Sequence, residues 1–312
     1  MIDFDGLRTD RSWRLTWSDD RLEEAVFRLE PDTAAERGAL VARLGGDASD
    51  PEQWEAVLVE ALLTDPAAAD LRRLELHLTD FHHSARRAAA ALGSRRRERL
   101  AELYFGHDFE FLYEDAATST GGTVDPLSRL HEGFVGETAL WEALPALRDL
   151  TVEGGLLFDD IDGVALKSLT SLRLRGAVLA GGEVFPGRLP SVVTLTLDVA
   201  SDVFGVCCPV DLLEELDGDR FPALRHLDLG RAEFDPGDLA TLRALAAAPI
   251  LPRLESLRLR SLLVPDHVAP DRLAALAELA PAFAHLDLSI VGNVDVEGAD
   301  RVLGLSHHKP VE

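Results

Sequence analysis

A short leucine phrase recurs near the end of the chain and constrains the fold more than any other feature. It consists of an apolar residue, two variable residues and then an apolar, variable, apolar alternation. Such alternation is typical of a short strand with one buried face and one outward face. Recurrence of one strand phrase predicts a solenoid. The three copies are Leu224-x-x-Leu227-Asp228-Leu229, Leu254-x-x-Leu257-Arg258-Leu259 and Phe283-x-x-Leu286-Asp287-Leu288.

Weaker copies of the phrase extend the array toward the N-terminus. Six of the seven intervals between copies are 22 to 32 residues long and one is 47, so most lie in or near the range of leucine-rich repeats. We therefore predict an α/β fold, a single right-handed leucine-rich-repeat solenoid with eight or nine parallel strands. A curved sheet would form its concave side, and helices and short turns its convex side. The aligned positions are Leu74, Leu103, Leu150, Leu172, Leu195, Leu227, Leu257 and Leu286.

The longer repeats carry helix signals after their strands. Asp235-Pro236 precedes leucines three residues apart that end at Pro249, and Pro270-Asp271 precedes a similar series that ends at Pro281. Proline in the first turn and proline beyond the end are start and stop signals. We predict a helix in each of these two segments.

The first 70 residues lack the full phrase, and we predict that they form an N-terminal cap over residues 71–312, the solenoid. Segments 13–17, 25–29 and 40–44 alternate like strands, and the Asp-Pro-Glu-Gln sequence at 50–53 predicts a helix over 51–63. The alternative is a separately functioning domain.

The 47-residue interval predicts an insertion at about 106–146. It contains the aromatic run Phe109–Tyr113 and then a polar stretch over 114–123 with the composition of a loop. A long loop on a rigid scaffold is often functional. The alternative is an extra strand whose aromatic side chains join the core.

Charge and composition narrow the function. The chain has 31 Lys and Arg against 55 Asp and Glu, a net charge of −24. An acidic surface repels phosphate backbones and anionic lipids, so we expect no nucleic-acid partner and no membrane partner. No secretory signal and no apolar run long enough for a membrane span occur, which predicts a cytoplasmic protein. Cys207 and Cys208 are interpreted as ordinary thiols.

Signatures of catalysis are absent from the sequence. The nucleophile elbow, the phosphate-binding loops, the zinc-binding H-E-x-x-H and the C-x-x-C motif do not occur. We expect no catalytic residues, no metal and no cofactor. The main alternative is an enzyme with its site in the 104–146 insertion.

The variable positions within the strands supply the candidate binding surface, because they would line the concave face. We expect Asp228, Arg258 and Asp287 to form successive rungs of one ladder, and Glu153, Arg175 and Asp198 another. Two interpretations stay open: the charges neutralise one another, or the arginines bind carboxylates of a partner. The candidate residues are Glu75, His77, Tyr104, His107, Glu153, Arg173, Arg175, Asp198, Asp228, Arg258, Arg260 and Asp287.

Three other clusters have ordinary explanations. The arginines at 86, 87, 95–97 and 99 are interpreted as a solvated face at a helix end, with anion docking as the alternative. Asp159-Asp160-x-Asp162-Gly163 resembles a calcium loop but has Ser171 where the final glutamate belongs. The pairs His82-His83 and His307-His308 are expected to be solvated.

The segments 221–229 and 238–259, and the final LDLS…GNVDVEGA, resemble cytoplasmic leucine-rich-repeat proteins of actinobacteria and related bacteria, in the ribonuclease-inhibitor-like superfamily. The segment WRLTW…ALVARLGG is similar to the front end of those proteins. The resemblance implies this fold and a protein-binding role, and it carries over no functional residues. We therefore expect a non-catalytic scaffold or regulator with a protein partner. Fold analogy adds a small-GTPase regulator as a further alternative.

Overall fold

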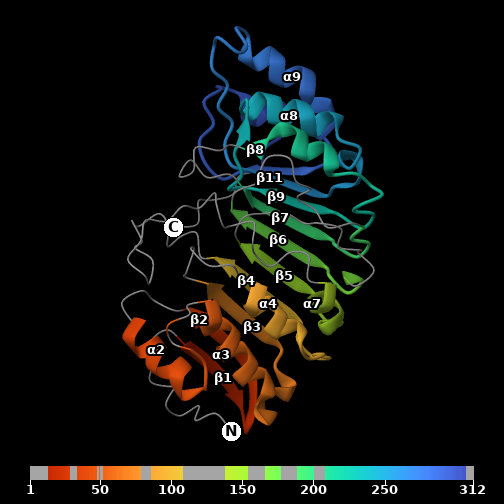
Figure 1. Ribbon diagram of the computed structural model, residues 1–312. Coiled ribbons are helices and arrows are strands. Elements are labelled where there is room, and N and C mark those ends of the chain that lie inside the picture. The colour runs from red at the N-terminus through yellow and green to blue at the C-terminus, as the bar shows by residue number, and fades with distance from the viewer. Residues whose placement is uncertain are drawn as a thin grey trace. The chain divides into compact units, whose positions relative to one another are not determined.

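The computed structural model describes residues 13–28, 34–47, 49, 52–78, 86–107, 138–153, 166–176, 188–199 and 208–306. The chain divides into two compact units. Helices and strands of both units are labelled in Figure 1. Unit 1 comprises Met1–Leu169 with Leu179–Pro186, and unit 2 comprises Thr170–Val178 with Gly187–Glu312. The predicted boundary at residue 70 falls inside unit 1, and the division into cap and solenoid stays a prediction.

Unit 1 contains five strands that neighbour one another in sequence order. β1 and β2 form an antiparallel hairpin, and the later pairings are parallel. Leu74, Leu103 and Leu150 stand opposite one another in this register and are buried, as the repeated phrase predicts. The strands are β1 (Trp13–Ser18), β2 (Arg21–Arg28), β3 (Arg73–Leu78), β4 (Glu102–His107) and β5 (Asp149–Glu153).

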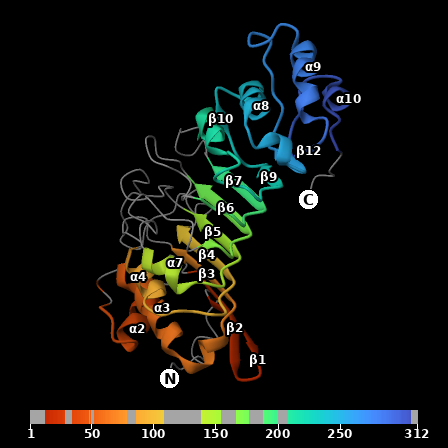
Figure 2. The ribbon, with the colours of Figure 1, turned by 90° about the vertical axis from the view of Figure 1, so that its right-hand side faces the viewer.

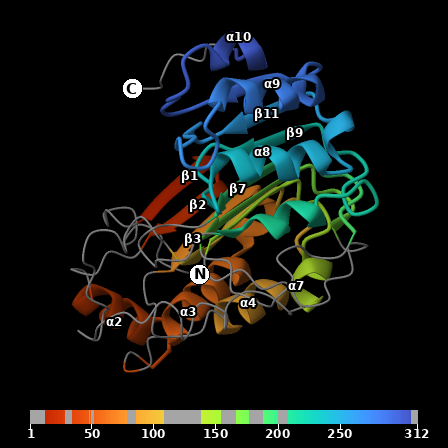
Figure 3. The same ribbon diagram turned by 90° about the horizontal axis from the view of Figure 1, so that it is seen from above.

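Helices cover one face of these strands. Figures 2 and 3 show α3 and α4 side by side, and Figure 2 shows α7 beside α4 on the same face of the strands. Trp141 of α7 is fully buried in this layer. The helices of unit 1 are α2 (Ala34–Arg43), α3 (Glu52–Thr64), the 3₁₀ helix η2 (Pro66–Asp70), α4 (Arg86–Gly93) and α7 (Thr138–Ala143).

The strands expected at 13–17 and 25–29 and the helix expected at 51–63 are confirmed by β1, β2 and α3. The strand predicted at 40–44 is wrong, because this segment belongs to the end of α2 and the turn after it. Val41 is buried and Leu44 half-buried. A spacing of three residues places these two side chains on one helix face, so the apolar pattern fits a helix as well as a strand.

In the described part of unit 2, five parallel strands belong to the large sheet and also neighbour one another in sequence order, and two further short strands form a separate parallel pair. Leu195, Leu227 and Leu257 stand opposite one another. Leu227, Leu229, Leu257 and Leu259 are at most 5% exposed, which confirms the predicted alternation. The strands are β6 (Ser171–Gly176), β7 (Thr194–Val199), β9 (His226–Leu229), β11 (Ser256–Leu259) and β12 (Asp287–Ile290).

The last strand pairs in a different register from the one predicted. Leu257 stands opposite Leu288, not Leu286. The amide of Leu286 donates a hydrogen bond to the carbonyl of Phe283 at 3.0 Å, so Leu286 belongs to the turn that ends the preceding helix. The third copy of the phrase therefore begins in a helix, and its strand uses Leu288 and Ile290.

The helices predicted after Pro236 and Pro270 are confirmed by α8 (Asp238–Ala247) and α9 (Arg272–Phe283). The side chain of Asp271 caps α9 by accepting a hydrogen bond from the amide of Ala274 at 2.9 Å. Pro281 lies inside α9 and is not its stop signal. The other elements of unit 2 are β8 (Cys208–Pro209), η6 (Val210–Glu215), β10 (Phe234–Asp235), η7 (Leu251–Arg253) and α10 (Ala299–Leu303).

The fold is thus α/β with mostly parallel strands, as predicted. Among the described residues no helix is long and apolar enough to cross a membrane. Several sequence features lie outside the described residues: the aromatic run and polar stretch at 109–123, the acidic segment at 159–163, both histidine pairs and Cys207.

Candidate functional site

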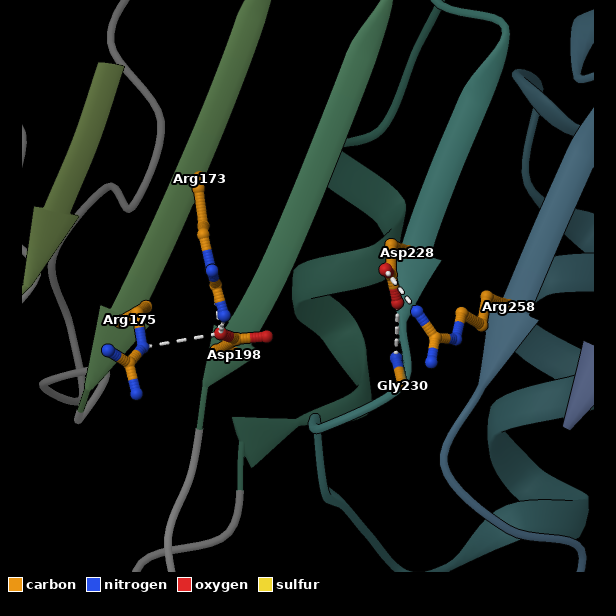
Figure 4. Close-up of polar contacts among 6 residues, drawn as sticks. All are labelled: Arg173, Arg175, Asp198, Asp228, Gly230 and Arg258. Carbon is orange, nitrogen blue, oxygen red and sulfur yellow. Dashed lines mark hydrogen bonds and ion pairs between the residues drawn. The ribbon is translucent and has the colours of Figure 1, made fainter. Parts of the chain in front are cut away.

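The strands of unit 2 carry two groups of charged side chains on the face opposite their buried leucines (Figure 4). The alternation that places Leu172 and Leu174 in the core directs Arg173 and Arg175 to the other face of β6. The same alternation places Asp198 on β7. Rigid strands therefore fix the positions of these charges.

Asp198 binds two arginines of the neighbouring strand. Its Oδ2 accepts a hydrogen bond from Nε of Arg173 at 2.8 Å and is also contacted by Nη2 of Arg173. Nε of Arg175 lies 3.3 Å from the same oxygen. The Asp198 side chain is 7% exposed and that of Arg173 is 41% exposed. Two guanidinium groups thus share one oxygen of a nearly buried carboxylate.

Further along the face, Arg258 lies on β11 and Arg260 directly after it. Each has one acidic partner among the described residues. Nη1 of Arg258 lies 3.4 Å from Oδ2 of Asp228, its opposite residue on β9. Oδ1 of Asp228 accepts a hydrogen bond from the amide of Gly230 at 2.8 Å (Figure 4). Arg260 pairs with Glu233, which lies in the turn after β9. The two arginine side chains are 45% and 43% exposed.

These ion pairs bear on the two interpretations of the charged face. All four candidate arginines have acidic partners, as mutual neutralisation requires. Three of the four keep more than two fifths of their side chain exposed, so donors remain available to a further carboxylate. The two interpretations are compatible with the same geometry.

The predicted ladders are only partly formed. Arg258 stands opposite Asp228, and Arg175 opposite Asp198, as expected. Asp287 does not extend the first ladder, because it stands opposite Ser256 while the buried Ser289 stands opposite Arg258. The two-residue register difference of β12 is the cause. Sequence reasoning also missed Glu233, since no strand alternation places a turn residue.

Unit 1 carries a separate polar cluster on β3 and β4. Nε2 of His77 lies 3.1 Å from Oε2 of Glu75, and Arg73 contacts Oε1 of the same carboxylate. The rings of His77 and Tyr104 stack with their centroids 4.0 Å apart. The hydrogen bond from His77, together with Arg73 and against the opposing effect of burial, lowers the pKa of Glu75 to about 2. Glu75 is therefore ionised and holds the imidazole in place.

The rest of this cluster is tightly packed. Glu153 is 2% exposed, and the hydroxyl of Tyr104 is buried without a hydrogen-bond partner among the described residues. Gly106 adopts φ +152°, and a Cβ at this position would lie 1.8 Å from the carbonyl oxygen of Glu153. Only glycine allows β4 and β5 to approach so closely here. His107 ends β4, and its side chain lies outside the described residues.

The imidazole of His77 links two strands. Its Nε2 binds Glu75 of β3, its Nδ1 is buried from solvent, and its ring stacks on Tyr104 of β4. The His77 side chain is 15% exposed. The sequence could have indicated the contact between Arg73 and Glu75, because Arg73 lies two residues before Glu75 and therefore on the same face of the strand.

The basic cluster at 86–99 is not a uniformly solvated face. Nη2 of Arg97 donates to the carbonyl of Leu63 near the end of α3, and Nη1 lies 3.5 Å from the carbonyl of Ala68. Burial lowers the pKa of Arg97, with a smaller contribution from Arg95. Arg99 binds Asp70 at 2.8 Å. Arg97 thus joins α3 and η2, a role that the sequence does not indicate.

No group of three or more His, Cys, Asp or Glu side chains capable of holding a metal occurs in the described part of the chain.

Comparison with known proteins identifies a likeness of fold. No family model matches the chain, and no curated protein matches it. A crystal structure of a protein from Bacteroides fragilis, solved by a structural genomics consortium, is similar with a TM-score of 0.53. The two sequences are 16% identical, and the match covers 89% of this chain and 70% of the other. At this identity the likeness concerns the fold alone, so the chain shares its α/β architecture with the Bacteroides protein.

Proposed function

We propose that this protein is a non-catalytic scaffold or regulator of the leucine-rich-repeat type that binds a protein partner. The proposal includes the bacterial, cytoplasmic setting that the sequence resemblance implies. The binding surface is the arginine face of unit 2, defined as Arg173, Arg175, Asp198, Asp228, Arg258 and Arg260. Its target is an acidic segment of the partner.

The observation that carries this proposal is the exposure of three guanidinium groups along unit 2: Arg173 lies on β6, Arg258 on β11 and Arg260 directly after β11. Arg173, Arg258 and Arg260 are each between 41% and 45% exposed although each already has an acidic partner. A guanidinium has five N–H donors, and a single carboxylate uses only some of them. The remaining donors suit carboxylates from a second chain.

The internal ion pairs favour binding because they reduce its entropic cost. A salt bridge between exposed side chains contributes only about 0–1 kcal/mol to stability, but it restricts the arginine to few conformations. A partner that binds a restricted side chain loses less conformational entropy than one that must order a free arginine. Arginine is also one of the residue types enriched among the dominant contacts of protein interfaces.

The test uses charge reversal on the arginine face. The full-length protein and the double variant R258E/R260E serve as baits for affinity capture from the native cytoplasm, and captured proteins are identified by mass spectrometry. The affinity of each purified candidate is then measured. We expect the double variant to bind the partner with an affinity lower by about 30-fold or more, equivalent to about 2 kcal/mol. Its melting temperature should change little, because both positions are about half exposed.

Arg188 provides the matched control. It is exposed, lies before β7 and has no ion pair with another described residue. R188E reverses a single arginine outside the arginine face, which is half the charge change of the double variant, and should leave binding unaltered. The assignment of the surface would be overturned if R258E/R260E bound the partner with unchanged affinity. Loss of binding on substitution of the convex-side helices, or of the Arg95–Arg99 cluster, would then place the surface there.

A further inference from the structure

Unit 2 contains a cavity that the proposed arginine face does not explain. It lies between the turn that leads into α8 and the loop that follows β11, and it has a volume of about 510 Å³. This is within the range of pockets that hold small molecules. We name it the α8 pocket and define it by Phe234, Leu239, Arg243, Leu263, His267 and Val268.

The two walls of the α8 pocket are held in place by the fold. On one side Gly237 has φ +118°, a conformation that glycine adopts without strain, so the chain can turn sharply into α8. On the other side the amide of Leu262 donates to the carbonyl of Asn293, and the amide of Val264 donates to the carboxylate of Asp295. The loop after β11 is thus tied to the next repeat. A pocket with fixed walls loses little entropy when it binds a ligand.

The lining is mainly apolar. Phe234 and Leu239 are buried beneath the pocket, whereas Leu263 and Val268 at its edge are 44% and 48% exposed. Only five large hydrophobic side chains among the described residues are exposed, and these are two of them. Apolar surface in contact with water favours an apolar ligand.

The acidic side chains of the pocket already have partners. Glu233 pairs with Arg260. Asp238 accepts hydrogen bonds from the hydroxyl of Ser261 at 2.9 Å and from the amide of Leu263 at 2.7 Å. Glu233 is thus paired with a cation, and Asp238 is held by two neutral donors on its Oδ2.

The basic side chains differ in this respect. Arg243 and His267 line the pocket, are exposed and make no hydrogen bond or ion pair with another described residue. Arg243 presents all its donors, and a guanidinium binds a carboxylate with two parallel hydrogen bonds. The two basic side chains without partners among the described residues thus suit an anion, while the apolar walls suit an apolar body. A strongly hydrated anion such as free phosphate would meet only the first requirement.

We propose that the α8 pocket binds a small organic carboxylate with an apolar body, the carboxylate on Arg243 and His267 and the apolar body against Phe234, Leu239, Leu263 and Val268. Arg260 lines this pocket and also belongs to the arginine face, so the two sites adjoin. The carboxylate site itself uses Arg243 and His267, which lie outside that face.

The test compares two probes with the same carbon skeleton, one ending in a carboxylate and the other in a neutral hydroxyl. The ¹⁵N-labelled full-length chain is titrated with 4-phenylbutyrate and with 4-phenylbutan-1-ol, and amide shifts are followed by NMR. We expect the acid to produce saturable shifts confined to residues 234–243 and 260–268, with an affinity at least about 10-fold higher than that of the alcohol. Equal affinity for the two probes, or shifts outside these segments, would overturn the proposal.

Two variants at exposed positions separate the charge from the apolar walls. R243Q should lower the affinity for 4-phenylbutyrate by about 10-fold and leave the affinity for the alcohol unchanged. V268E places a negative charge at the edge of the α8 pocket and should lower the affinity for the acid more than the affinity for the alcohol. R188Q removes the same charge as R243Q at a distant exposed position and should bind as the wild type does. Wild-type affinity of R243Q for the acid would contradict the site.

Discussion

At the scale of single residues, Asp198 is the position where burial and charge coincide on the arginine face. Its carboxylate is 7% exposed and binds both Arg173 and Arg175, whose side chains are 41% and 15% exposed. Breaking a buried pair leaves an uncompensated charge in a poorly solvated place. The three side chains thus depend on one another for stability as well as for position.

We therefore predict that D198N destabilises the protein by about 2–3 kcal/mol, because it removes the negative charge between two guanidinium groups. The measurement is the free energy of unfolding in urea. D228N is the matched control, since Asp228 is 31% exposed and binds the exposed Arg258. It should cost about 1 kcal/mol or less. Equal losses for the two variants would show that burial of Asp198 contributes little.

Glu75 gives a prediction about pH. Its pKa in the folded protein is about 2, against an ordinary value of 4.5. A depressed pKa means that the ionised carboxylate stabilises the folded state above pH 4.5, and that this contribution is lost as the pH falls from 4.5 toward 2. We expect the free energy of unfolding of the wild type to exceed that of E75Q by about 1–2 kcal/mol at neutral pH. This figure allows for solvent screening of a partly exposed group.

The measurement is urea unfolding of both proteins at several pH values between 7 and 2. The difference between wild type and E75Q should stay constant down to about pH 5 and then shrink steadily. A difference that is independent of pH would mean that Glu75 acts through packing and not through its charge.

At the scale of elements, the register of β12 separates two leucines that look equivalent in the repeated phrase. Leu288 is fully buried and stands opposite Leu257, whereas Leu286 is half-buried in the turn after α9. Removing buried methyl groups costs transfer free energy and leaves a cavity. The same chemical change should therefore have unequal effects at the two positions.

We predict a loss of about 3 kcal/mol for L288A and of about 1 kcal/mol for L286A. Thermal or urea unfolding of the two variants measures the difference. The predicted order follows from the pairing of β11 with β12. A larger loss for L286A would instead support the register expected from the sequence phrase.

At the scale of the whole molecule, net charge dominates the electrostatics. The chain carries −24, and the described exposed ion pairs each contribute little. Raising NaCl from about 0.01 M to about 0.15 M shortens the Debye length from about 30 Å to about 8 Å. Screening should weaken the repulsion among acidic groups more than it weakens local ion pairs.

We therefore expect the melting temperature to rise by about 1–2 °C over this range, as for a gain near 1 kcal/mol in a chain of this size. Differential scanning calorimetry at several NaCl concentrations provides the measurement. A melting temperature that falls with salt would mean that the ion pairs outweigh the repulsion.

The sequence by itself determined the local elements. Alternation with period two gave β6, β7, β9 and β11 their buried leucines, because this pattern depends only on which face of a strand each residue occupies. Proline and capping residues indicated α8 and α9 for a similar reason, since their effects act within one helical turn. The rungs Asp228–Arg258 and Asp198–Arg175 followed once neighbouring strands were aligned on these leucines.

Only the tertiary structure decided what depends on distant segments. The apolar spacing at 40–44 fits a strand or a helix, and packing in unit 1 selected α2. The end of α9 set the register of β12 and moved Asp287 away from Arg258. Glu233 meets Arg260, and Arg97 meets the carbonyl of Leu63, across 27 and 34 residues of sequence. Such contacts form because folding brings segments that are distant in sequence next to one another, and a local sequence pattern carries no information about which distant segments meet.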